Sequence, residues 1–82
     1  MAKLKYINFE HVGLVIFETT VNHDVMKQLV GHKAISAGFC SLPSNDELGN
    51  EPHCFGKSTS LGLVSSEKDT ERLKMLLQPY GA

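Results

Sequence analysis

Four polar side chains in this sequence have the chemistry of a small ligand-binding surface. Ser36, Ser58 and Ser60 carry hydroxyl groups, and Lys57 places an ammonium group beside the second of them. Hydroxyl and ammonium groups donate hydrogen bonds to carboxylate and phosphate oxygens. These four are therefore candidate ligand-binding residues of a small-molecule or anion-binding protein or enzyme. The structural alternative is that small side chains let a helix or a second subunit approach the sheet closely.

The segment Gly56-Lys57-Ser58-Thr59 looks like the end of a phosphate-binding P-loop, but the rest of that motif is absent. The motif needs a glycine five residues before its Gly-Lys pair, and Glu51 stands there. The lysine should also begin a helix, whereas Ser60-Leu61-Gly62-Leu63 is typical of a strand. The sequence therefore argues against a nucleoside triphosphate site of this class.

Cys40 and Cys54 could form a disulfide, bind a metal, act as a nucleophile or simply be small buried residues. A disulfide would stabilise the fold by about 3 kcal/mol, but thiols stay reduced in the cytosol. Zinc-binding spacings such as Cys-x-x-Cys are absent, and His53, next to Cys54, would point to the opposite face of a strand. We expect no metal and no cofactor, and a cysteine-dependent metal or redox role remains an alternative.

A catalytic cysteine would need a base within hydrogen-bond reach. None of the four histidines has a position in the sequence that singles it out. His23 and His32, at the two ends of an expected helix, are typical of exposed surface positions. No catalytic residue is therefore assigned, and the sequence favours a protein that is not an enzyme.

Two mirrored triplets predict a hairpin with a defined register. Gly38-Phe39-Cys40 and Cys54-Phe55-Gly56 are the reverse of each other, so antiparallel pairing places Cys opposite Cys and Phe opposite Phe. The face with the phenylalanines and Ile35 is expected to be core, and the other face carries the cysteines and serines. A bulge at either glycine would break the register beyond it, so the cysteine pairing is the safer part.

The hydrophobic pattern predicts a single small α+β domain over residues 1–82. The expected order is β-β-α-β-β-α, with strands at 5–10, 14–17, 33–42 and 53–63 and a first helix at 22–30 that Gly31 ends. Ser66 and Asp69 form a capping box that begins the second helix. We expect a four-stranded, mainly antiparallel sheet with both helices on one face, which leaves the other face for water, a ligand or a second copy.

Composition excludes several classes of partner. The chain has 82 residues and a formal net charge of −1, and its eight Lys and Arg residues are scattered, so nucleic acid is not an expected partner. No apolar run approaches the roughly 18 residues that span a membrane, and no signal peptide is present, which favours a cytoplasmic protein. Because a chain this short buries only a modest core, the leading hypothesis is a non-enzymatic protein-interaction module that pairs with itself as a homodimer or with another protein.

Overall fold

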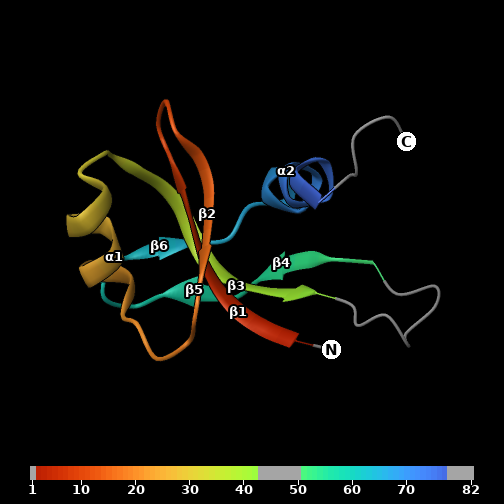
Figure 1. The fold of residues 1–82 in the computed structure, drawn as a ribbon, viewed down its shortest axis with the longest axis horizontal. Helices are drawn as coiled ribbons and strands as arrows, with labels where there is room; N and C mark the ends of the chain where they lie inside the picture. The colour runs from red at the N-terminus through yellow and green to blue at the C-terminus, as the bar shows by residue number, and fades with distance from the viewer. Residues whose placement is uncertain (1, 43–50, 78–82) are drawn as a thin grey trace.

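The computed structural model describes residues 2–42 and 51–77 and confirms the predicted α+β class (Figure 1). The main sheet has four antiparallel strands in the order β2-β1-β3-β4. A short ribbon of two further strands, β5 and β6, follows β4 in the chain. The bounds are β1 (Ala2–Phe9), β2 (Gly13–Phe17), α1 (His23–Val30), β3 (Ala34–Leu42), β4 (His53–Phe55), β5 (Lys57–Ser58), β6 (Leu63–Val64) and α2 (Glu67–Leu77).

The mirrored triplets pair in the predicted register. Phe39 lies opposite Phe55, and Cys40 lies opposite Cys54. The pairing ends at Gly56, whose φ of 77° turns the chain out of the sheet. A Cβ atom on Gly38 of β3 would lie 2.6 Å from the Phe55 carbonyl oxygen of β4, so only glycine fits at this position. The expected single strand at 53–63 is therefore wrong, and three short strands, β4, β5 and β6, take its place.

The two helices cover opposite faces of the sheet, and not one face as expected. Tyr6 and Cys40 pack against Leu73 of α2, on what we call the α2 face. Ile7 belongs to a second cluster, against which Met26 of α1 packs, on the α1 face. Neighbouring residues of a strand point to opposite faces, and Figure 1 shows the helices on either side of the sheet. Because β1 buries side chains on both of its faces, each face needs a cover.

The expected core face is also different in the structure. Cys40 is fully buried, whereas Phe39 and Phe55 are only half-buried. Both phenylalanines lie outside the two apolar clusters formed by the described residues. Ile35 is 53% exposed, because the register between β1 and β3 shifts at this point and skips it.

Local signals at the helix ends match the structure. Gly31 ends α1 in the left-handed conformation, with φ of 75°, and its N–H bonds the Lys27 carbonyl at 3.0 Å. The capping box that begins α2 is confirmed, because the Ser66 hydroxyl accepts the Lys68 N–H at 3.2 Å and Asp69 accepts the Ser66 N–H at 3.1 Å. Neither α1 nor α2 is long and apolar enough to cross a membrane.

Candidate functional site

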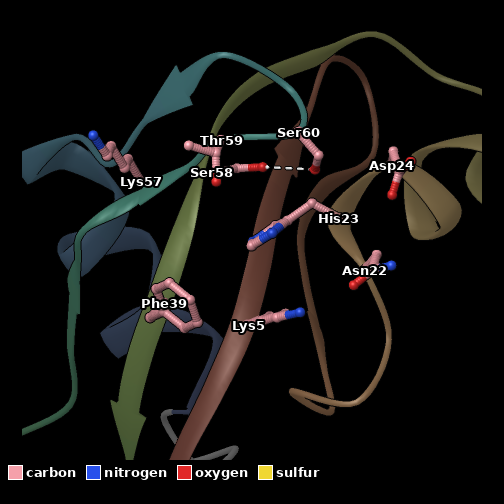
Figure 2. A pocket seen from close by; sticks show the side chains of 9 residues that line it. All are labelled: Lys5, Asn22, His23, Asp24, Phe39, Lys57, Ser58, Thr59 and Ser60. Atoms are coloured by element: carbon pink, nitrogen blue, oxygen red, sulfur yellow. Dashed lines mark hydrogen bonds between the residues drawn. The ribbon is translucent and has the colours of Figure 1, made fainter.

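A pocket of about 350 Å³ lies between the main sheet, the β5–β6 ribbon and the beginning of α1 (Figure 2). Three of the four predicted ligand-binding residues, Lys57, Ser58 and Ser60, line it together with Thr59. They come from β5 and the turn that follows it. The ribbon therefore brings consecutive polar residues to one wall of a cavity, because Gly56 bends the chain away from β4.

Two of the hydroxyls on this wall have different surroundings. Ser58 is 3% exposed, and its Oγ accepts the Leu61 N–H at 3.3 Å, which fixes the turn of the ribbon. The Ser60 Oγ lies 3.4 Å from it and belongs to an exposed residue. Ser60 is therefore available to a ligand, while the Ser58 hydroxyl also holds the local fold.

Two lysines give the pocket a positive charge. Lys57 is exposed at the rim, and its ammonium group points away from His23 (Figure 2). Lys5 of β1 is half-buried, and its Nζ donates to the Val21 carbonyl at 2.8 Å beside the cavity. Asp24 supplies the single carboxylate among the lining residues. Two ammonium groups against one carboxylate favour an anionic ligand.

His23 is fixed at the base of the pocket and is not the exposed residue that its position in the sequence suggests. Only 5% of its surface is exposed, and its Nε2 lies 2.8 Å from the Gly38 carbonyl oxygen. A carbonyl oxygen only accepts hydrogen bonds, so Nε2 carries the proton. The ring also packs edge-on against Phe17 and Phe39, with centroid distances of 5.5 and 5.9 Å.

No protein-family model, curated protein or solved structure matches this sequence.

Ser36, the fourth predicted residue, does not line this pocket. It pairs with Asn8 across β1 and β3 and is 5% exposed. Among the described residues its Oγ has no hydrogen-bond partner. A regular hairpin continued beyond Gly38 and Gly56 would bring Ser36 beside the other serines, but the chain leaves the sheet at Gly56.

Besides Phe39 and Thr59, four lining residues were not predicted as site residues, namely Lys5, Asn22, His23 and Asp24. They lie in β1 and at the beginning of α1, far in the sequence from the ribbon. Their types are ordinary for a strand and a helix start, so no local pattern marks them. Only the packing of α1 on the sheet brings them to the pocket.

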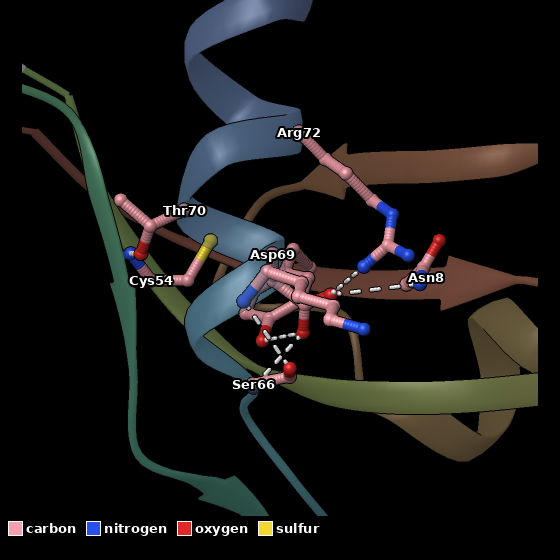
Figure 3. Close-up of polar contacts among 8 residues, drawn as sticks. Asn8, Cys54, Ser66, Asp69, Thr70 and Arg72 are labelled. Atoms are coloured by element: carbon pink, nitrogen blue, oxygen red, sulfur yellow. Dashed lines mark hydrogen bonds and ion pairs between the residues drawn. The ribbon is translucent and has the colours of Figure 1, made fainter.

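The α2 face holds a second polar cluster, in which the protein supplies its own partners (Figure 3). Asp69 is fully buried. Its carboxylate accepts the Tyr6 hydroxyl at 2.6 Å, and the Asn8 amide lies 3.5 Å away. The Arg72 guanidinium and the Ser66 N–H each donate to it at 3.1 Å. Burial and the bond to Asp69 raise the pKa of Tyr6 well above its ordinary value. Such a saturated cluster stabilises the fold and leaves no group for a ligand.

The two cysteines are free thiols in a protected position. Burial raises the pKa of Cys40 to about 11. Burial, followed by the neighbouring Cys40 and Asp69, raises the pKa of Cys54 to about 12. Thiols with raised pKa values are poor nucleophiles and poor metal ligands at neutral pH. Within residues 2–42 and 51–77, no three His, Cys, Asp or Glu side chains are placed to hold a metal ion.

An apolar groove of about 390 Å³ lies between the β1–β2 hairpin and α2. Val12, Met75 and Leu76 line it and are 49%, 73% and 55% exposed. Beside it, β2 forms an edge of the sheet, and its sequence, GLVIF, contains neither a charge nor a proline. Natural proteins usually protect such edges with charges, prolines or bulges. This edge lacks all three within its five residues.

Proposed function

We propose that this protein is a cytoplasmic, non-enzymatic binding protein for a small anionic ligand. The observation that carries the proposal is the gathering of Lys57, Ser60 and Lys5 around one pocket at the beginning of α1. The positive end of the α1 dipole adds to the attraction that the two ammonium groups exert on an anion. In a cytoplasmic setting Cys40 and Cys54, which lie opposite each other in β3 and β4, would stay reduced.

The size of the pocket suits a small molecule. A volume of about 350 Å³ lies near the lower end of the range found for small-molecule sites. Its lining offers ammonium and hydroxyl donors together with two aromatic rings, those of His23 and Phe39. A phosphate or carboxylate group bound by Ser60 and Lys57 would exchange water for charge-assisted hydrogen bonds.

Binding without catalysis is supported by the partners of the reactive side chains. The Nε2 atom of His23 bonds the Gly38 carbonyl, and the Ser58 hydroxyl contacts Ser60 and the Leu61 N–H. The described pocket therefore contains no serine whose hydroxyl bonds an imidazole, the arrangement that activates a hydroxyl as a nucleophile.

The proposal is tested by titrating ¹⁵N-labelled protein with inorganic phosphate and following the amide resonances of residues 57–60. We expect saturable shifts that weaken about ten-fold in Lys57→Ala and in Ser60→Ala, with melting temperatures close to that of the wild type. These two variants are chosen over Ser58→Ala because the buried Ser58 hydroxyl also holds the turn.

Two matched variants control for charge. Lys33→Ala removes one positive charge from an exposed residue outside the pocket and should leave phosphate binding unchanged. Asp24→Asn removes the carboxylate of the pocket and should tighten binding. Phosphate shifts that are absent from residues 57–60, or equal losses in Lys33→Ala and Lys57→Ala, would reject the site.

We propose homodimerisation as a second function, on different grounds from those that the sequence offered. The expected bare sheet face is gone, because a helix packs on each face. The uncharged β2 edge and the adjacent apolar groove support pairing with a second copy. Two β2 strands related by a two-fold axis would pair antiparallel, satisfy each other's free backbone groups and cover Met75 and Leu76.

Native mass spectrometry over a range of concentrations tests the dimer. We expect the mass of two chains, reduced to one chain in Leu76→Glu, which puts a charge in the groove. Leu29→Glu makes the same change at an exposed position of α1 and should leave the dimer intact. A wild-type protein that remains a single chain at every concentration contradicts dimerisation through this edge.

A further inference from the structure

A row of aromatic rings leads out of the pocket along the α1 face of the sheet. It begins at His23, whose ring packs edge-on against Phe39. The rings of Phe39 and Phe55 then lie 6.1 Å apart at an interplanar angle of 25°. His53 continues the row, with its ring centroid 5.3 Å from that of Phe55. The pocket and the row share Phe39, so they form one continuous surface.

The middle of this row is not part of the hydrophobic core. Phe39 and Phe55 are half-buried and lie outside both apolar clusters of the described residues. The Lys3 ammonium group lies 4.5 Å from the centroid of the Phe39 ring and 6.0 Å from that of Phe55. This cation–π contact keeps a positive charge above the rings. Two rings on neighbouring strands, inclined to each other by 25° and beside exposed basic groups, form the kind of platform on which planar bases stack.

We propose that the ligand of the pocket is an anion that carries a planar aromatic ring, of the chemical class of a nucleoside monophosphate. The phosphate lies at Lys57 and Ser60, and the ring lies on the platform formed by Phe39 and Phe55. This assignment rests on the proposed anion-binding function and adds the identity of the second half of the ligand. The pocket of about 350 Å³ holds the phosphate end of this ligand, and the platform that continues from Phe39 holds its ring.

The formal charge of the protein is consistent with a single nucleotide. A net charge of −1 disfavours a long polyanion, which binds through many phosphate contacts. One phosphate needs only the local positive charge of the pocket. The site differs from a P-loop, because no helix begins at Lys57 and the ribbon turns back into β6.

The proposal is tested by comparing three probes in NMR titrations, namely adenosine monophosphate, ribose 5-phosphate and adenosine. Stacking of one base on aromatic side chains strengthens binding by about five-fold or more. We therefore expect the nucleotide to bind at least about five-fold more tightly than ribose 5-phosphate. Phe55→Leu should remove this difference and leave ribose 5-phosphate binding unchanged, because Phe55 does not line the pocket. Phe55→Trp, which keeps an aromatic ring, should retain it.

The outcomes separate this proposal from the function on which it rests. If the nucleotide and ribose 5-phosphate bind with equal affinity, the proposal that an aromatic ring stacks on Phe39 and Phe55 is overturned. The proposed anion site is then unaffected. A preference for the nucleotide that survives in Phe55→Leu shows that the ring lies elsewhere and also overturns it. No binding of any phosphate probe removes the anion site as well. A single-stranded oligonucleotide that binds more than ten-fold better than the nucleotide overturns the assignment of a single nucleotide.

Discussion

The two helices begin in contrasting ways. At the beginning of α2, Asp69 is buried, and four groups of the protein hydrogen-bond its carboxylate. At the beginning of α1, Asn22 makes no side-chain capping bond, and Asp24 is exposed beside a cavity. Both starts bring polar residues against the same sheet, one on each face. The start of α2 is completed by the protein itself, and the start of α1 is open to a ligand.

The contrast shows how this small domain divides its polar residues between stability and binding. A buried polar group without a partner destabilises the fold by about 1–3 kcal/mol, so the network on the α2 face must be complete. At the α1 pocket, Asp24, Lys57 and Ser60 are exposed to water. They can therefore exchange water for a ligand without loss of stability.

The largest expected effect is the loss of Asp69. Asp69→Ala leaves the Tyr6 hydroxyl and the Asn8 amide without their acceptor in the interior and should lower the free energy of unfolding by at least about 3 kcal/mol. Asp24→Ala, at the start of the other helix, should lower it by less than about 1 kcal/mol. Urea denaturation of both variants measures the difference. Equal losses in the free energy of unfolding would show that Asp69 contributes no more to stability than Asp24 does.

A smaller loss of stability is expected at Gly38 of β3, which contacts both β4 and His23. Gly38→Ala places a Cβ atom 2.6 Å from the Phe55 carbonyl oxygen, so β3 and β4 must separate. We expect a loss of about 1–3 kcal/mol in urea denaturation. Because the Gly38 carbonyl also holds His23, amide shifts should extend to the start of α1. Amide shifts confined to β3 and β4 would show that the pocket does not depend on the close contact between Gly38 and Phe55.

The smallest effect concerns the alkaline limit of stability. Cys40 and Cys54 have pKa values raised from about 9 to about 11 and 12, so the folded state keeps their protons to higher pH than the unfolded chain does. This stabilisation is complete below pH 9 and is lost as the pH rises through 11–12. We expect the free energy of unfolding to fall by about 1 kcal/mol per thiol, about 2 kcal/mol in all, between pH 9 and pH 10 under reducing conditions.

A variant separates the thiols from other alkaline effects. The raised pKa of Tyr6 lowers the free energy of unfolding in the same direction from about pH 10, the ordinary pKa of tyrosine, upward. Cys40→Ala should therefore show a shallower decrease of stability between pH 9 and pH 10, whatever its stability at pH 7. An unchanged slope would show that the thiols do not set the alkaline limit.

Local sequence signals predicted much of the fold. The mirrored triplets gave the pairing of Cys40 with Cys54, Gly31 marked the end of α1, and Ser66 with Asp69 marked the beginning of α2. Each of these features depends on residues close in sequence or on direct cross-strand pairing. Such features can be recognised without knowledge of the tertiary packing.

The features that were missed depend on longer-range packing. The placement of α1 and α2 on opposite faces follows from the two-sided burial of β1, which its alternating pattern did not reveal. The break at Gly56 was recognised as possible, but the direction in which the ribbon turns was not. His23 enters the site only because α1 brings it to the Gly38 carbonyl, a contact between residues 15 positions apart.

The β5–β6 ribbon leaves and rejoins the rest of the chain at nearly one point. The Ser65 N–H bonds the Gly56 carbonyl at 3.0 Å, so residues 57–64 form a loop with its two ends tied together. Leu61 and Leu63 anchor this loop on the core and must remain apolar. The other positions can diverge in evolution, or be exchanged by grafting, while the register of the main sheet stays the same. Ligand preference could then change from one relative to another by replacement of this segment alone.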